Sequence, residues 1–213
     1  MKSILATMCA ATLYIGAACA ADDKPPKEDF DAAVAQLVGE TGFGARHPDA
    51  PAEIEQFGRL VGVWSVEQEL RKRDLSWLKQ TTGVWVWKYA VGGFALQDLW
   101  YQNEKRLPSY MEGLGHDYQL TALRVFDPSA GKWKVAWASN SAGGGSGAVF
   151  GEFEAQEENG EIVMRGPGAE NVGLQRIVFY DISDDLFRWR SEYSQDNGET
   201  WIEIMRLTAH RVR

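Results

Sequence analysis

Hydrophobic and polar residues alternate with a period of two along most of the chain from Val63 onward, which is the pattern of strands with one buried face. Short turn sequences such as Gly92-Gly93 separate the alternating segments, and no segment of helical spacing intervenes. Strands joined in this way pair antiparallel, and a large sheet removes its exposed edges by closing. We therefore predict an all-β, antiparallel up-and-down barrel of about ten strands, over residues 63–70, 83–91, 94–101, 120–126, 132–140, 148–155, 161–165, 174–182, 186–194 and 201–212.

The residues before Val63 carry helical rather than strand spacing. Residues 29–38 and 52–60 each repeat apolar side chains three and four positions apart, so we expect a short helix in each. Residues 40–51 between them are rich in Gly and Pro and are expected to form a loop over one end of the barrel. Within the barrel, residues 143–147 are predicted to be a flexible Gly-rich turn, and the longer connections 102–118 and 166–173 are candidate rim segments at its entrance.

The N-terminus has the pattern of a secretory signal peptide. Lys2 precedes an apolar stretch too short to span a bilayer comfortably, and Ala18-Cys19-Ala20 offers a cleavage site. Cleavage after Ala20 is the favoured interpretation, and a lipoprotein lipidated at Cys19 is the alternative. We expect a signal peptide over residues 1–20, a leader with a short helix and loop over 21–51, a barrel domain over 52–213, and a periplasmic or secreted location.

Charge and cysteine content argue against several classes of function. The net charge is −8, and the chain lacks the clustered cations that bind nucleic acid. Cys9 and Cys19 both fall in the predicted signal peptide, so disulfides, thiolate catalysis and cysteine metal sites are not expected in the barrel. No later segment predicts a membrane span. The nine Trp residues indicate either a thick packed core, which is the simpler interpretation, or an aromatic-lined pocket.

Strand alternation offers two alternative linings for an interior pocket. In residues 186–193, one face carries Arg188, Arg190 and Glu192, and the other carries three aromatic side chains. An inward arginine face would bind a carboxylate, whereas an inward aromatic face would cost less to bury. Because alternation alone does not decide between them, the candidate ligand-binding residues combine both alternatives: Trp85, Trp87, Tyr89, Trp100, Trp137, Arg188 and Arg190.

Candidate catalytic and metal-binding residues are few. His47, His116 and His210 are the only histidines, and they lack the spacing of metal ligands, so we expect no metal. We also expect no cofactor, because a single His210 on the last strand is better explained as a surface residue than as a haem ligand. His116, Asp98 and Glu192 are weak catalytic candidates, since each could exchange a proton if it faced a cavity.

Residues 194–201 match the S-x-D-x-G-x-T-W Asp-box known from sialidase propellers. In this motif the Ser and Asp side chains accept hydrogen bonds from the turn backbone, Gly takes the positive φ, and Trp anchors the returning strand. The chain contains one copy and no repeat of blade length, so a structural hairpin is predicted rather than a glycosidase.

Gly62-Val63-Trp64, at the start of the first predicted strand, resembles the G-x-W motif of lipocalin-like barrels, in which the Trp plugs the closed end. More broadly the chain resembles the bacterial DUF1579 family, a calycin-like group without an assigned activity. The resemblance runs from about Gln56 to Val212 and rests on residues 60–64, 83–89, 92–98, 123–128, 131–133 and 187–192, with residues 194–201 also fitting. It implies a lipocalin-like barrel and carries no catalytic residues.

Three functions are compatible with this fold. The leading hypothesis is an exported lipocalin-like protein that binds a small, mostly apolar ligand, with or without an acidic group, in the barrel. One alternative is an isomerase, cyclase or hydratase acting on a hydrophobic substrate there, and enzymatic activity is left open with binding favoured. The other is an interaction module with a filled barrel, whose N-terminal helix would present Phe30, Val34 and Leu37 to a partner. The sequence leaves the oligomeric state open.

Overall fold

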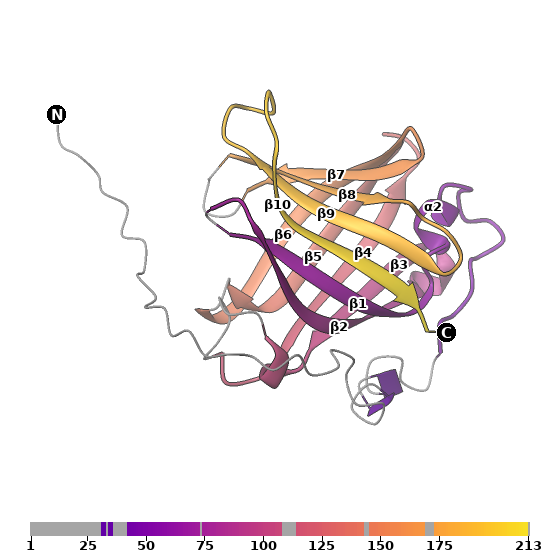
Figure 1. Cartoon of the computed structure of the whole chain (residues 1–213). Coiled ribbons are helices and arrows are strands. Elements are labelled where there is room, and N and C mark those ends of the chain that lie inside the picture. Colours follow the sequence, from indigo (N-terminus) through magenta and orange to yellow (C-terminus); the bar gives the residue numbers. More distant parts are fainter. Residues whose placement is uncertain are drawn as a thin grey trace.

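The chain forms a closed antiparallel barrel in the computed structural model, which describes residues 31–32, 34–35, 42–72, 74–107, 114–142, 145–168 and 173–212 (Figure 1). Each strand pairs with its neighbours in sequence, and β1 pairs with β10 to close the ring. The strands are β1 (Gly62–Arg71), β2 (Trp77–Ala90), β3 (Ala95–Gln102), β4 (Tyr118–Asp127), β5 (Lys132–Ala142), β6 (Gly145–Glu158), β7 (Glu161–Pro167), β8 (Leu174–Tyr180), β9 (Leu186–Ser194) and β10 (Ile202–Arg211). The predicted fold class is confirmed.

Helical structure is confined to short segments. The helix α2 (Ile54–Gly58) lies at one end of the barrel, beside the C-terminal end of β10 (Figure 1). Single 3-10 turns, η1 (Val91–Gly93) and η2 (Glu104–Arg106), follow β2 and β3. Of the helix predicted over residues 29–38, the described residues 31, 32, 34 and 35 are helical. No helix among the described residues is long and apolar enough to cross a membrane. The predicted signal peptide, residues 1–20, lies outside the described residues.

Two strands, β2 and β6, begin at least three residues before their predicted starts. β2 begins at Trp77, well before the predicted start at Gly83, because its first residues pair with the end of β1. β6 begins at Gly145, which pairs with Ala142 of β5, so most of the predicted Gly-rich turn is strand. In both places backbone pairing across a hairpin outweighs the weak strand propensity of polar and glycine residues.

Trp64 fixes the end of the barrel at which α2 lies. Its side chain is fully buried, and its indole Nε1 donates to the carbonyl oxygen of Leu60 at 2.7 Å. The Arg211 guanidinium lies 4.1 Å from the centre of the indole and donates to the carbonyl oxygens of Val61, at 2.6 Å, and Arg59, at 2.8 Å. Burial lowers the pKa of Arg211. The last strand is therefore tied to both the first strand and the helix.

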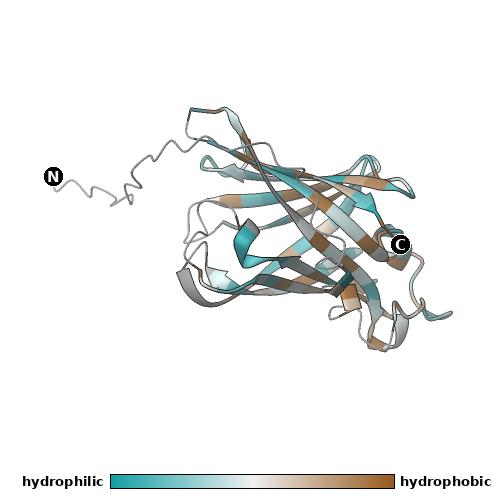
Figure 2. Ribbon diagram, turned by 60° about the horizontal axis from the view of Figure 1, so that its bottom comes forward, coloured by the Kyte–Doolittle hydropathy of each residue, from teal (hydrophilic) through white to brown (hydrophobic). Residues whose placement is uncertain are grey.

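The interior at this end is filled by aromatic rings. Phe57 of α2 is fully buried and contacts Trp87, Trp133 and Phe179, with ring centres 5.8, 5.0 and 5.6 Å away. Hydrophobic and hydrophilic residues alternate along the strands, so one set of side chains reaches this core (Figure 2). The helix α2 and the rings it contacts close one end of the barrel.

Val34, in the described part of the predicted N-terminal helix, packs against the outside of the barrel. Val34 is buried against Val63, Val84 and Val86, which point outward from β1 and β2. Val34 is therefore not exposed, contrary to the interaction-module hypothesis, because these outward valines need cover from water. Phe30 and Leu37, the other two residues of that hypothesis, lie outside the described residues.

The loop before α2 lies against the turn between β2 and β3, at the closed end. The His47 backbone N–H donates to the Gly93 carbonyl oxygen at 3.2 Å, and the His47 ring stacks on Phe94 with centres 4.4 Å apart. Gly93 has a φ of 91°, and a Cβ there would lie 2.4 Å from the Ala45 carbonyl oxygen. Only glycine therefore permits this close approach of loop and turn.

The connection between β9 and β10 adopts the Asp-box hairpin. Ser194 Oγ accepts from the Gly198 N–H at 2.7 Å, while Asp196 accepts from both the Thr200 N–H, at 2.9 Å, and the Thr200 hydroxyl, at 2.5 Å. The Trp201 indole donates to the Gly198 carbonyl oxygen at 3.1 Å. These bonds are internal to the turn, in agreement with the predicted structural role.

The hydrogen bonds from Thr200 lower the pKa of Asp196 from its ordinary 3.8 to about 2. A lowered folded-state pKa means that the unfolded chain binds this proton more tightly, so the turn's contribution to stability is present above pH ~4 and is lost as the pH falls through ~2. We expect an NMR titration of the Asp196 carboxyl carbon to give a midpoint near 2, and Thr200→Val to raise it toward 3.8. A wild-type midpoint near 3.8 would contradict this account of the turn.

Candidate functional site

The barrel encloses a cavity of about 1060 Å³ on the side away from α2. Apolar side chains form most of its wall, including Trp85, Trp100, Trp137, Phe153, Phe179 and Trp189. The cavity extends to the ends of β3, β5 and β7, where Gln102, Ser141 and Pro167 border it. Its mouth is therefore at the end of the barrel opposite Phe57 and the rings that Phe57 contacts, which together form an aromatic plug.

A buried ion pair lies at the floor of the cavity. Asp98 is 0% exposed and Arg124 is 3% exposed, and Arg124 Nη1 donates to Asp98 Oδ1 at 2.5 Å. The same carboxylate accepts from the Trp85 indole at 2.6 Å and from the Ala122 backbone N–H at 3.1 Å. Three donors thus hold Asp98, which offsets the desolvation of its charge.

Strand alternation and register bring this pair together. Leu96, Asp98 and Trp100 are inward residues of β3, and Ala122 and Arg124 are inward residues of β4. Asp98 is directly opposite Ala122, and Leu96 is opposite Arg124, so the two charged side chains are diagonal neighbours on the inner face. Ala122, Arg124 and Phe126 alternate along β4 on its buried face. This alternation is the sequence signal that could have identified Arg124 as an inward residue.

Aromatic rings hold the Arg124 guanidinium from the side of the plug. Its central carbon lies 4.3 Å from the centre of the Trp87 ring and 5.0 Å from that of Phe57. A delocalised cation lying over aromatic faces is favoured electrostatically, and more so where water is excluded. The floor of the cavity and the plug beneath it are therefore one packed unit.

The structure places the predicted aromatic residues at different depths. Trp85, Trp100 and Trp137 line the cavity. Trp87 is fully buried in the plug and does not line it. Tyr89 is half-buried and packs against the same core, where burial, aided by the Glu55 carboxylate, raises its pKa. Three of the five predicted aromatic residues thus reach the cavity.

Arg188 and Arg190 lie on the outer face of β9, so the alternative in which they face the cavity is wrong. Arg188 pairs with Asp181 at 3.0 Å, and Arg190 lies 3.4 Å from both Glu161 and Glu192. Phe187 and Trp189, 0% and 8% exposed, take the inward positions instead. The physical reason is that burying an aromatic ring releases water, whereas burying a guanidinium requires a partner for its charge.

The catalytic candidates lie in three separate places. Asp98 is at the cavity floor, with its oxygen atoms engaged by the three donors described above. Glu192 is on the outer wall, where Arg176 donates to it at 2.6 Å. His116 is exposed and does not line the cavity, and its Nδ1 lies 3.0 Å from the Asp117 carbonyl oxygen. The fold does not combine them into one proton-transfer site.

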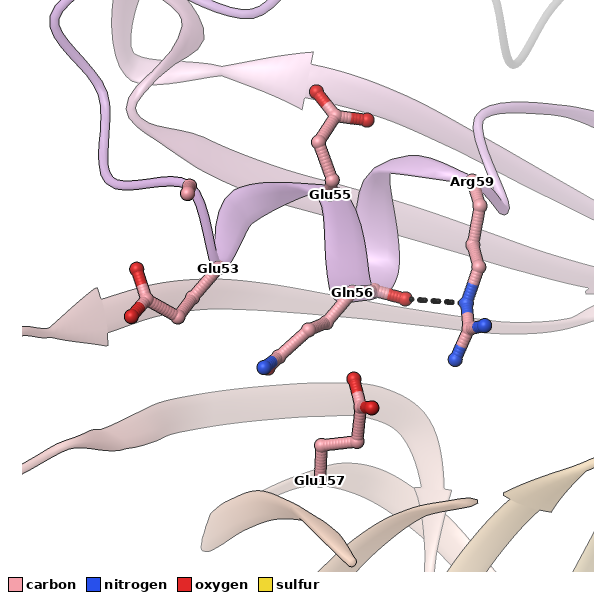
Figure 3. Close-up of a pocket in the computed structure, with 6 residues that line it drawn as sticks. Glu53, Glu55, Gln56, Arg59 and Glu157 are labelled. Carbon is pink, nitrogen blue, oxygen red and sulfur yellow. Dashed lines mark hydrogen bonds between the residues drawn. The ribbon is translucent and has the colours of Figure 1, made fainter. Parts of the chain in front are cut away.

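A second hollow lies on the surface beside α2 (Figure 3). Glu53 at the N-cap of α2, Glu55 within the helix and Glu157 on β6 border it. Arg59 donates to the Gln56 carbonyl oxygen at 3.0 Å. Among the described residues, no group of three His, Cys, Asp or Glu side chains is placed to hold a metal ion. This hollow is solvated surface outside the barrel.

Comparison with known proteins identifies the fold and not the activity. No protein-family model matches the chain, and no curated protein matches it. The structure of an S-type phycobiliprotein lyase from Guillardia theta aligns with a TM-score of 0.50 and 12% identity, over 75% of this chain and 92% of that chain. At this identity the alignment supports the closed antiparallel barrel fold and says nothing of function.

Two further structures align less closely. Rv2717c from M. tuberculosis has a TM-score of 0.40 and 10% identity, over 78% of this chain and 100% of that chain. A protein of unknown function from the DUF3598 family of Nostoc punctiforme PCC 73102 has a TM-score of 0.24 and 12% identity, over 76% of this chain and 100% of that chain.

Removing one partner of the floor ion pair leaves a buried, uncompensated charge. We expect Arg124→Met to lower the free energy of unfolding by about 3–5 kcal/mol. The matched control is Arg188→Met, whose exposed pair with Asp181 contributes at most about 1 kcal/mol. Urea denaturation followed by Trp fluorescence measures both. Equal losses in the two variants would contradict the assignment of a buried, tightly held floor.

Proposed function

We propose that this chain is a lipocalin-like binding protein that holds a small, mostly apolar ligand in its barrel. The observation that carries the proposal is the cavity of about 1060 Å³ with largely apolar walls. Ligand sites in proteins are concave, mostly apolar and roughly 300–1,000 Å³ in volume, with a few polar groups that orient the ligand. The volume of this cavity lies just above that range.

The energetics of the interior support binding rather than a filled interaction module. Water that enters through the mouth lies against largely apolar walls, which is unfavourable. An apolar ligand that displaces this water buries those walls. Trp85 and Trp100, with ring centres 5.2 Å apart, provide rigid surfaces for a flat or extended apolar molecule.

The contacts of Asp98 favour binding over catalysis. A general base needs a lone pair directed at the proton that it removes. The Asp98 oxygens already accept bonds from Trp85, Ala122 and Arg124. Asp98 instead holds Trp85 and Arg124 in place at the floor of the cavity.

Export and family membership are also part of the proposal. A signal peptide over residues 1–20, with cleavage after Ala20, supports a periplasmic or secreted protein, and lipidation at Cys19 is the alternative. The segments that resemble the DUF1579 family support membership in that group. The intact mass of the protein from its own host tests the first point, because cleavage after Ala20 predicts a mature chain that begins at Ala21.

Filling the cavity should abolish binding of an apolar probe. N-phenyl-1-naphthylamine is an uncharged dye that fluoresces in apolar sites, and we expect the wild-type protein to bind it. Ala122 points into the cavity, so Ala122→Phe should weaken this binding by at least about tenfold. Fluorescence titration measures the change.

Leu123 provides the matched control for that variant. It is the next residue on β4 and is 38% exposed on the outer face. Leu123→Phe should therefore leave dye binding as in the wild type. A wild-type protein that does not bind the dye, or equal weakening by both substitutions, would contradict binding inside the barrel.

A further inference from the structure

The described part of the cavity wall presents almost no free charge. Of the described residues that line it, Asp98, Arg124 and Glu152 carry charged groups. Glu152 stands between Gly151 and Phe153 on β6, and its side chain is exposed on the outer-facing set. Asp98 and Arg124 are the charges that face the interior.

Those two charges cancel each other. The Arg124 guanidinium is bonded to Asp98 at 2.5 Å and lies over two aromatic rings, so it is already neutralised and held in place. A carboxylate brought to Arg124 would also approach the Asp98 carboxylate and would be repelled by it. An ammonium group brought to Asp98 would likewise approach the Arg124 guanidinium and would be repelled by it. Arg124 Nε has no hydrogen-bond partner among the described residues, but this atom is buried, so a ligand in the cavity does not reach it. Either ion would therefore lose its hydration without gaining an accessible unpaired partner.

Neutral polar groups collect at the mouth of the cavity. Gln102 Nε2 donates to Gln68 Oε1 at 3.1 Å, and both residues are buried at the ends of β3 and β1. Ser139 Oγ donates to the Ser141 carbonyl oxygen at 2.8 Å at the end of β5. Burial raises the pKa of Tyr118, at the start of β4, against a smaller effect of its hydrogen bond with Ser139. Amides and hydroxyls of this kind bind other neutral polar groups.

We infer that the ligand is an uncharged molecule, with an apolar body deep against Trp85 and Trp100 and a hydroxyl, carbonyl or amide group at the mouth. This inference rests on the proposed binding function and narrows its ligand class. The inferred ligand has no acidic group, because Arg188 and Arg190, which would have bound one, lie on the outer face. Neutral ligands are preferred over anions because the described wall offers no accessible unpaired cation, which would favour a carboxylate.

Competition between matched amphiphiles tests the inference. Decan-1-ol, decanoate and decylammonium share one alkyl chain and differ in the charge of the head group. At about pH 8, where decanoate is ionised, we expect decan-1-ol to displace half of the bound N-phenyl-1-naphthylamine at a concentration about tenfold lower than either ion. Displacement by decanoate or decylammonium at an equal or lower concentration would overturn the inference while leaving the binding function intact. Failure of the dye itself to bind would instead refute the binding function.

Asp98→Asn tests the charge balance directly. Freed of its counter-charge, Arg124 should then accept a carboxylate, and we expect the concentration of decanoate needed for displacement to fall about tenfold relative to that of decan-1-ol. Asp181→Asn makes the same change in an exposed outer pair and should leave all three competitors as in the wild type. A folded Asp98→Asn protein with unchanged decanoate binding would overturn the inference. If circular dichroism shows that this variant does not fold, the wild-type series decides the question.

Discussion

The pairing of β1 with β10 is the constraint on which the rest of the structure depends. It runs from Trp64 opposite Arg211 to Leu70 opposite Met205 and turns a meander into a closed ring. Closure removes exposed edges and defines an inside and an outside for every strand. Arg211 reinforces it by lying over Trp64 and bonding to the backbone beside α2. A ring of this width is filled by side chains at one end only.

The contrast between the two ends explains the cavity. At the α2 end, Phe57 and the large rings it contacts occupy the full cross-section. Above them the pair formed by Asp98 and Arg124 makes a floor that is polar yet electrically balanced. Because Arg124 also lies over Trp87 and Phe57, the plug holds the guanidinium and the guanidinium holds Asp98. The depth of the cavity and the charge balance of its floor therefore both depend on how the rings of the plug pack.

Most of the fold could be predicted from the sequence because alternation is a local property. The strands, the G-x-W plug and the Asp-box turn each follow from a few neighbouring residues, and the structure contains all three. The early start of β2 depends on pairing with β1 and was not predicted. Which face of β9 points inward depends on burial around the whole ring, so alternation alone left the placement of Arg188 and Arg190 open. Arg124 was missed because its partner lies on another strand.

The proposed binding depends on an open, largely apolar cavity above the ion pair at the floor. A crystal structure of the protein grown with N-phenyl-1-naphthylamine would show whether this space takes up a ligand. We expect electron density for the dye inside the barrel, beside Trp85 and Trp100 and above Asp98. An interior filled by the protein's own side chains, with no dye within it, would refute binding in the barrel.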